Sequence, residues 1–300
     1  MTAQNASLSV GVLVLNYNTW DLALRAVDAA IRLEGDAVHE YVLYDDGSSI
    51  PPPAGIDGRV RVIRGEINRG YTRALRLAFD ATESDLIVVF DADAYPLTPF
   101  AARVREQFAG DDRLGQVAFF SEGEGGSSTE SFIQGEPSKW SLLLGQRLDT
   151  LLRRRPPASP ELCVFSCCMA TRRGAYTQIG GIDDKFDFLD ADVDYSMRLR
   201  RSGWKVSADP CLKAFHRGGA WQQLQRHRVL RFYKTRWYLL RKHHLIRNVF
   251  LARSFILARL YVEQLFLKAF GSVLFRKPEV RTEKMLGRRD VISYCRDYYR

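Results

Sequence analysis

Residues 84–93 read SDLIVVFDAD, an apolar run that leads directly into two aspartates. The apolar residues 86–90 are typical of a strand buried on both faces of a parallel sheet. Ligands bind at the carboxyl ends of such strands, and residues two apart in an extended chain point to the same side. Asp91 and Asp93 can therefore face one ligand. Two carboxylates at this spacing suit Mg²⁺ or Mn²⁺, with phosphate oxygens and water as the other ligands. A lone Asp-x-Asp is more often a solvated strand end or a helix cap, so the surrounding sequence has to decide.

The neighbouring sequence repeats the pattern of a strand that ends in polar residues. Apolar runs at residues 12–15, 41–44 and 60–63 precede Asn16, Asp45 and the stretch NRGY at residues 68–71. Helical spacing of apolar residues follows at residues 21–33 and again at about 72–81. This alternation over residues 10–94 predicts an α/β domain with a parallel, doubly wound sheet and right-handed crossovers. The polar strand ends would then share one edge of the sheet.

These residues resemble the family 2 glycosyltransferases, which are inverting enzymes of the GT-A fold that use nucleotide sugars. The resemblance rests on LNYN (15–18), DDGS (45–48), NRGY (68–71), DAD (91–93), GGIDDKF (180–186), DADVDYSMRL (190–199), GW (203–204) and HRGG (216–219). Several separated motifs in this order, over roughly residues 10–220, are far more specific than any one of them. The resemblance implies a Rossmann-like, mostly parallel sheet flanked by helices.

A nucleobase site is expected at the second of these strand ends. Asp45 can accept the N3–H of a uracil or thymine ring, a hydrogen bond that cytosine cannot offer. The resemblance implies the same contact, and we assign Asn16, Asp46 and Asp91 to the same donor site. An Asx turn over the following Gly47-Ser48 explains the two acidic residues as well, and for Asp46 this explanation is at least as good.

The NRGY stretch precedes a predicted helix, so its backbone N–H groups can face the charge of a diphosphate. Asn68, Gly70 and Arg73 are therefore further candidates for donor binding. A plain surface turn with solvated arginines explains the stretch equally well. Many family members carry a second asparagine eight residues after the first, and this chain has Arg76 there. Sugar contacts implied by that position do not carry over.

The second acidic cluster is the candidate for the catalytic base. Inverting transfer needs a base on the face of the sugar opposite the leaving diphosphate. The resemblance implies a Glu-Asp pair at the start of a helix, with the Asp as base. This chain reads Ala191-Asp192, so Asp192 is the first choice and Asp190 the second. Without the resemblance, capping of the following helix is the simpler role for these carboxylates.

His216 lies at the end of a predicted strand, before a turn of small residues. The resemblance implies that this histidine approaches the metal or the diphosphate, and a neutral imidazole can supply a ligand nitrogen. With Asp91 and Asp93 it would complete a site for Mg²⁺ or Mn²⁺. A lone histidine is more often an ordinary hydrogen-bonding residue.

Charge is distributed unevenly along the 300 residues. Residues 1–221 hold 25 Lys and Arg against 30 Asp and Glu, whereas residues 222–300 hold 19 against 5. We therefore expect a catalytic domain at residues 1–225 and a basic, amphipathic helical region at residues 226–300. Five cysteines without paired spacing indicate neither a disulfide framework nor a zinc knuckle. The apolar run 10–15 is too short for a signal peptide, so we expect a cytoplasmic enzyme.

The basic region predicts a peripheral contact with the inner face of a membrane. Residues 249–275 are rich in Leu, Phe and Ala, but four charged residues interrupt them. Each charge would cost about 2.5–3.5 kcal/mol at the bilayer centre, so helices lying in an anionic interface fit better than a spanning helix. Packing on the catalytic domain, or on a second subunit as a homodimer, is the alternative. Nucleic acid ranks lowest as a partner, since no RNA-binding motif occurs.

These features together predict a metal-dependent, inverting glycosyltransferase. The donor would be a dTDP- or UDP-linked sugar, and the acceptor a hydroxyl of a glycan or lipid-linked precursor of a surface polysaccharide. A deoxyhexose from a dTDP donor is expected from the resemblance to rhamnosyltransferases alone. Residues 121–161 would be an acceptor-binding lid or an inert connection. The alternatives are a sugar nucleotidyltransferase, disfavoured because residues 10–20 hold a single glycine, and a non-catalytic binding protein with the same fold.

Overall fold

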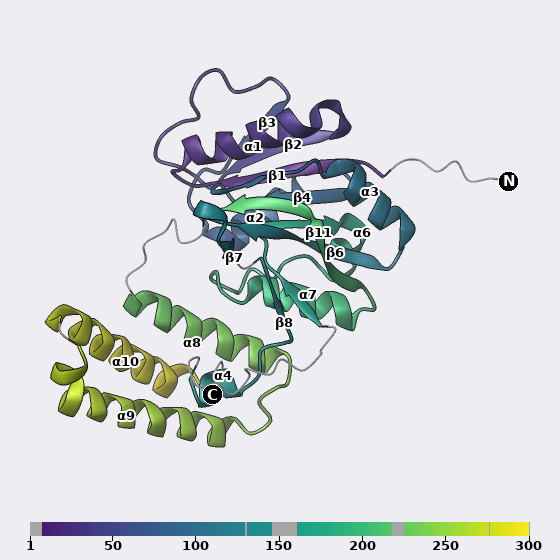
Figure 1. The fold of residues 1–300 in the computed structure, drawn as a ribbon. Helices are drawn as coiled ribbons and strands as arrows, with labels where there is room; N and C mark the ends of the chain where they lie inside the picture. Colours follow the sequence, from purple (N-terminus) through teal and green to yellow (C-terminus); the bar gives the residue numbers. More distant parts are fainter. Residues whose placement is uncertain (1–7, 130, 146–160, 218–224, 276, 300) are drawn as a thin grey trace. The chain divides into compact units, whose positions relative to one another are not determined.

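The computed structural model describes residues 8–129, 131–145, 161–217, 225–275 and 277–299 (Figure 1). The chain forms two compact units, which are described separately. The first comprises Met1–Glu136, Ser159–Asp187 and Ala191–Ala220, and the second Pro137–Ala158, Phe188–Asp190 and Trp221–Arg300. Much of the predicted lid, and Gly218 and Gly219 of the HRGG motif, lie outside the described residues.

A mixed central sheet forms the core of the first unit. In the described residues its strands lie in the order β3-β2-β1-β4-β10-β6-β11-β5, and β7 pairs with β6. The strands are β1 (Val10–Asn16), β2 (Glu40–Asp45), β3 (Val60–Arg64), β4 (Leu86–Phe90), β5 (Ala94–Pro96), β6 (Leu114–Glu122), β7 (Ser128–Thr129), β10 (Cys168–Arg172) and β11 (Lys205–His216). A separate pair joins β8 (Phe132–Gln134) and β9 (Leu162–Val164).

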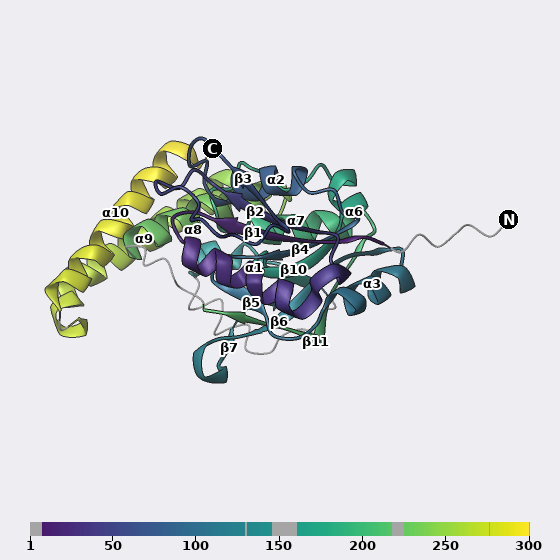
Figure 2. The same ribbon diagram turned by 90° about the horizontal axis from the view of Figure 1, so that it is seen from above.

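The first four strands are parallel, as the sequence predicts. Both β1 and β4 are buried along their whole length, which explains their continuous apolar runs. The helices are α1 (Trp20–Glu34), α2 (Tyr71–Asp80), α3 (Ala101–Gly110), α6 (Arg173–Gln178) and α7 (Ala191–Arg201), with short 3-10 turns η1 (Gly35–Ala37) and η2 (Glu124–Gly126). Because the connections from β1 and β3 run in opposite directions, right-handed crossovers place α1 and α2 on opposite faces of the sheet (Figure 2).

The reversal between β1 and β4 is the point where open α/β sheets form a crevice at the strand ends. Beyond β4 the sheet changes direction, since β10 runs antiparallel to both β4 and β6. The strand β11 is parallel to β6, and the short β5 pairs antiparallel with β11. This last pairing sets His216 opposite Ala94, immediately after the DAD motif.

The second unit is helical. It contains α4 (Trp140–Leu143), α8 (Gln225–Lys242), α9 (Val249–Leu274) and α10 (Pro278–Tyr298), and Figure 1 shows the three long helices packed together. Apolar residues from all four helices form its core, including Leu142, Trp237, Leu260 and Val291. Asn248 caps α9 by accepting a hydrogen bond from the Leu251 N–H at 2.9 Å. In the described part of the chain, no helix has both the length and the low charge needed to cross a membrane.

Candidate functional site

The DAD motif forms a turn directly after β4. The backbone N–H of Asp91 donates to Cys167 O at 3.0 Å, and the N–H of Ala94 donates to Asp91 O at 2.9 Å. The chain then enters β5, and pairing with β11 brings His216 alongside. The N–H of Arg217 closes the arrangement by donating to Asp93 O at 3.1 Å. Backbone pairing therefore fixes three side chains that lie far apart in sequence.

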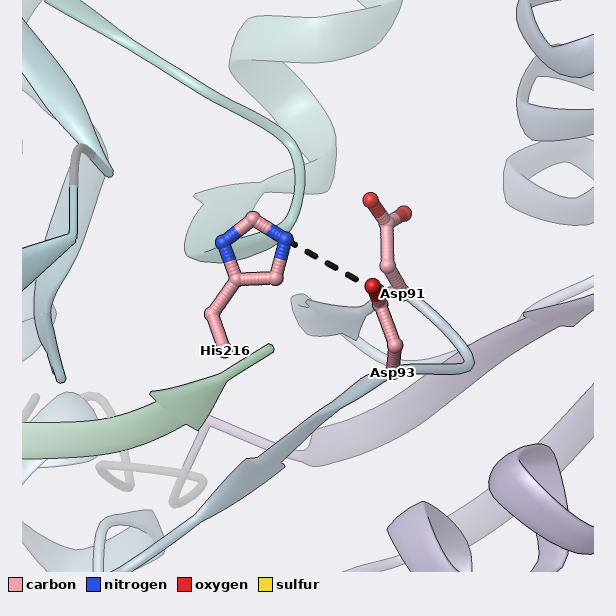
Figure 3. A group of neighbouring side chains, drawn as sticks. All are labelled: Asp91, Asp93 and His216. Carbon is pink, nitrogen blue, oxygen red and sulfur yellow. Dashed lines mark ion pairs between the residues drawn. The ribbon is translucent and has the colours of Figure 1, made fainter. Parts of the chain in front are cut away.

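Asp91, Asp93 and His216 point toward one another (Figure 3). One ligand atom from each lies within 4.8 Å of the others, and His216 Nε2 is 3.7 Å from Asp93 Oδ1. Burial and the charge of Asp93 raise the pKa of Asp91 to about 6. Burial lowers the pKa of His216, but contact with the Cys167 thiol and the charges of both aspartates outweigh it and raise that pKa to about 9. The cluster thus concentrates negative charge where a cation would relieve it.

The donor set fits a divalent cation. Two carboxylates and one imidazole nitrogen are the mixed oxygen and nitrogen ligands that Mn²⁺ accepts, and the carboxylates also suit Mg²⁺. The Nδ1 atom of His216 is buried and has no hydrogen-bond partner in the described residues. That nitrogen points away from the two aspartates, whereas Nε2 faces them and is the atom that would bind a cation (Figure 3). The structure therefore brings together the three residues that the sequence assigned to a metal site.

Tyr71 connects this cluster to the segment between β9 and β10. Its hydroxyl lies 2.7 Å from Asp91 Oδ1 and 2.6 Å from Ser166 Oγ. Burial and the charges of Asp91 and Asp192 raise the pKa of Tyr71 well above its ordinary value. The charge of Asp192 thus contributes to the electrostatic environment of this hydroxyl. Tyr71 belongs to the NRGY motif, and its position at the first residue of α2 is the only sequence feature that points to its role.

Asp192 is half-buried in the first turn of α7. The next acidic residue, Asp194, is buried and accepts a hydrogen bond from Arg198 Nε at 2.7 Å, so it stabilises the helix from within. Ala191, which stands where the resemblance implies a glutamate, is buried. Of the two acidic residues in α7, Asp192 is the one that is partly exposed, and its charge acts on Tyr71.

Asp190, the second candidate for the base, belongs to the other unit. Its carboxylate accepts two hydrogen bonds from Arg236, from Nε at 2.9 Å and from Nη2 at 2.8 Å. The side chain is 4% exposed, and the residue adopts a left-handed backbone with φ 66°. A buried carboxylate held by a bidentate arginine is a structural ion pair in this conformation.

The Asp45 carboxylate is fully buried at the end of β2. It accepts hydrogen bonds from Asn16 Nδ2 at 2.8 Å, from the Ser48 N–H at 3.2 Å and from the Ser48 hydroxyl. Arg64 Nε lies 3.3 Å from Asp45 Oδ2, the oxygen that also accepts from the Ser48 N–H. Asn16 in turn accepts from the Thr19 N–H at 3.1 Å and so fixes the entry to α1. Both carboxylate oxygens of Asp45 thus have partners within the protein, and no sequence pattern pointed to Arg64 as one of them.

Asp46 holds the NRGY loop in place. It accepts from the N–H groups of Arg69 at 3.0 Å and Gly70 at 2.9 Å, and Asn68 Oδ1 also accepts from Gly70 at 2.8 Å. The Asx turn predicted as the alternative for Asp46 is therefore replaced by a longer-range contact. Arg73 is exposed and lies 3.8 Å from Asp184. Two of the loop's N–H groups consequently point at Asp46, whereas Arg73 remains accessible to solvent.

Comparison with known proteins gives one match to a protein family. The family model described as glycosyl transferase family 2 matches residues 11–180. No curated protein matches the sequence of this chain.

Solved structures share the fold at low sequence identity. GalNAc-T7 with UDP, GalNAc and Mn²⁺ is 18% identical with a TM-score of 0.56, covering 79% of this chain and 51% of that one. Mannosyltransferase PcManGT from Pyrobaculum calidifontis, in complex with GDP-Man and Mn²⁺, is 16% identical with a TM-score of 0.58, covering 98% and 88%. S. aureus TarS 1–349 is 14% identical with a TM-score of 0.53, covering 96% and 87%. The chain thus spans about half of the GalNAc-T7 chain.

Proposed function

The chain belongs to glycosyl transferase family 2, and we propose that it is a metal-dependent, inverting enzyme that uses a pyrimidine nucleotide sugar. The family and the GT-A fold are those that the sequence predicted. The observation that carries the proposal is the meeting of Asp91, Asp93 and His216 at the carboxyl edge of the sheet. The charge of Asp192 acts on Tyr71, whose hydroxyl donates to Asp91. An acidic site of this kind suits a reaction in which a diphosphate leaves and a hydroxyl is deprotonated.

Asp93, Asp91 and His216 would hold Mn²⁺ or Mg²⁺. A divalent cation supplies positive charge that stabilises the departing diphosphate. Two structures with the same fold contain Mn²⁺, which supports this choice of ion. The chain's own contribution is to fix the ligand geometry through the pairing of β5 with β11, and to hold Asp91 with the Tyr71 hydroxyl.

Asp192 would be the catalytic base. Its carboxylate takes the proton of an acceptor hydroxyl, and the hydroxyl oxygen forms a bond to the anomeric carbon of the sugar. The bond from that carbon to the diphosphate oxygen breaks on the opposite face, so the nucleoside diphosphate leaves and the configuration inverts. Asp190 is the weaker candidate, because its carboxylate is held by Arg236.

The donor site would extend from the metal to Asp45. A uracil or thymine N3–H would reach the Asp45 carboxylate by replacing Arg64, whose side chain is 38% exposed. Asn16 would keep the carboxylate in place, and Asp46, Asn68, Gly70 and Arg73 would shape the neighbouring loop. The related structures hold UDP in one case and GDP-Man in the other, so the fold alone does not select the base.

We assign the sugar and acceptor by resemblance. The sugar would be a deoxyhexose carried on dTDP, with a UDP-linked sugar as the alternative donor. The acceptor would be a hydroxyl of a lipid-linked or surface-polysaccharide precursor. Both assignments rest on the similarity of the motifs to rhamnosyltransferases.

Substitution of the two candidate bases tests the proposal. With Mn²⁺ and a panel of dTDP- and UDP-sugars, release of nucleoside diphosphate should fall about 10²–10⁴-fold in Asp192→Asn. Binding of the nucleotide should be unchanged. Asp190→Asn tests the second candidate by the same chemical change two residues away, and it should stay within about tenfold of the wild type. Because this substitution also breaks the buried ion pair with Arg236, thermal unfolding has to show that the variant is folded at the assay temperature.

Two results would count against this assignment. Equal losses in both variants would remove the case for Asp192 as base. Nucleotide binding by the wild type without turnover of any sugar would instead favour a non-catalytic binding protein, the reading supported by Ala191 and Arg76.

A further inference from the structure

One face of α9 is exposed and apolar. The large exposed side chains include Phe250, Phe255, Val262, Phe266, Phe270 and Val273, and Val273 is 82% exposed. At 100° per residue, the large exposed side chains of this helix occupy an arc of about 200°. The helix has 26 residues and is therefore about 39 Å long. A soluble protein rarely leaves a contiguous apolar surface of this size without a partner.

Two of the charged residues of α9 point into the helical unit. Arg259 donates to Glu263, to the Tyr233 hydroxyl and to Leu142 O, the last at 3.1 Å. Glu263 Oε2 lies 3.3 Å from Arg288 Nε on α10. Of the four charges that interrupt this stretch in the sequence, Arg259 and Glu263 are therefore satisfied on the protein side. The polarity of α9 is the reverse of that of an ordinary surface helix.

Positive charge surrounds the apolar face. Arg247 precedes α9, Lys277 follows it, and both are exposed. A groove of about 430 Å³ between α9 and α10 is lined in part by Tyr261, Lys268 and Arg289. Neither Lys268 nor Arg289 has an ion-pair partner among the residues that the structure describes. The groove thus offers two cations next to an apolar surface.

We propose that α9 lies flat on an anionic membrane, with its apolar face among the lipid headgroups and the α9–α10 groove against their phosphates. A wide apolar arc edged by Lys and Arg is the pattern of an interfacial helix, whereas a coiled-coil seam is narrower. A second copy would also bring a second strongly basic surface, since residues 222–300 hold 19 Lys and Arg against 5 Asp and Glu. An anionic bilayer attracts that charge. This inference does not depend on the proposed glycosyl transfer.

Cosedimentation of the full chain with lipid vesicles tests the proposal. Binding to vesicles of phosphatidylcholine mixed with phosphatidylglycerol should exceed binding to phosphatidylcholine alone, and salt should weaken it. Phe255→Glu combined with Phe266→Glu should reduce binding at least tenfold. The control combines Ile50→Glu with Leu77→Glu, which adds the same charge at exposed apolar positions of the first unit and should bind like the wild type. Circular dichroism and the melting temperature check that each variant folds.

Charge reversal tests the groove separately. Each basic residue near an anionic surface contributes about 1 kcal/mol, or about fivefold in binding, so Lys268→Glu with Arg289→Glu should weaken vesicle binding at least tenfold. The proposal would be overturned if the wild type did not bind anionic vesicles, or if the α9 variant bound them as well as the control does. Light scattering supplies the other decisive outcome. A wild-type dimer that becomes monomeric in the α9 variant, without vesicle binding, would assign this face to a second copy.

Discussion

Asp91 is destabilising in the metal-free protein because its charge is costly where it lies. Burial and the nearby Asp93 raise its pKa to about 6, although the Tyr71 hydroxyl donates to it. A bound cation would reverse this balance by favouring the ionised form. Asp91 therefore lowers the stability of the metal-free protein and raises the protein's affinity for the metal.

Asp91→Asn should stabilise the metal-free protein at pH 8. The amide keeps an oxygen that can accept the Tyr71 hydrogen bond but removes the unfavourable charge. With about 1.36 kcal/mol for each pKa unit, the gain is at most about 3 kcal/mol. Thermal unfolding in EDTA measures it, and Mn²⁺ should raise the melting temperature of the wild type much more than that of the variant. A variant less stable than the wild type in EDTA at pH 8 would contradict this account.

The same carboxyl fixes the direction of the pH dependence. An aspartate in the unfolded chain loses its proton near pH 4, whereas folded Asp91 keeps it until about pH 6. The folded state binds more protons in this window, so its contribution to stability is full below pH 4 and is lost as the pH rises through 6. The difference in stability between wild type and Asp91→Asn should therefore grow from pH 4 to pH 7. A constant difference would show that the pKa of Asp91 is the same in the folded and unfolded states.

The turn after β2 and the NRGY loop are packed against each other, with their backbones in direct contact. Gly47 adopts φ 70°, and a Cβ there would lie 2.5 Å from the carbonyl carbon of Ile67 and 2.8 Å from the nitrogen of Asn68. The neighbouring Asp46 binds the same loop through Arg69 and Gly70. Glycine at this position is thus required both by its backbone conformation and by the lack of space.

Gly47→Ala should displace the NRGY loop and weaken binding of nucleoside diphosphate at least tenfold, with a marked fall in melting temperature. Gly55→Ala is the matched control, since Gly55 has φ 82° but no atom within 4 Å of a Cβ. The control carries only the backbone strain of about 1–2 kcal/mol and should bind nucleotide normally. Calorimetry and thermal unfolding measure both effects. If the two variants bound nucleoside diphosphate with similar affinity, the NRGY loop would not be part of the donor site.

At the scale of the whole molecule, local pattern predicted the parallel half of the first unit well. Apolar runs with polar ends define β1, β2 and β4, and their alternation with helices determines how they pair. The antiparallel half was harder to predict from the sequence, because the pairing of β5 with β11 joins segments about 120 residues apart. The family resemblance, and not the local pattern, suggested that His216 would meet Asp93.

Side-chain contacts over long range were the part that sequence could not give. Three such contacts depend on tertiary packing. They are the ion pair of Arg64 with Asp45, the hydrogen bonds from Arg236 to Asp190 and the hydrogen bond between Tyr71 and Ser166. The helical unit shows the same limit. Charged residues in α9 argued against a spanning helix, but only the folded structure shows that Arg259 and Glu263 face inward.

Asp91, Asp93 and His216 are proposed to bind a nucleoside diphosphate through a divalent cation. Thermal unfolding of wild type and Asp93→Asn with UDP, dTDP, GDP and CDP, each with and without Mn²⁺, tests it most directly. A ligand at 100 times its Kd stabilises the native state by about 2.7 kcal/mol. We expect UDP or dTDP to raise the melting temperature of the wild type only when Mn²⁺ is present, and we expect no such rise in Asp93→Asn. A rise that is independent of Mn²⁺ or retained in the variant, or no rise with any nucleotide, would contradict it.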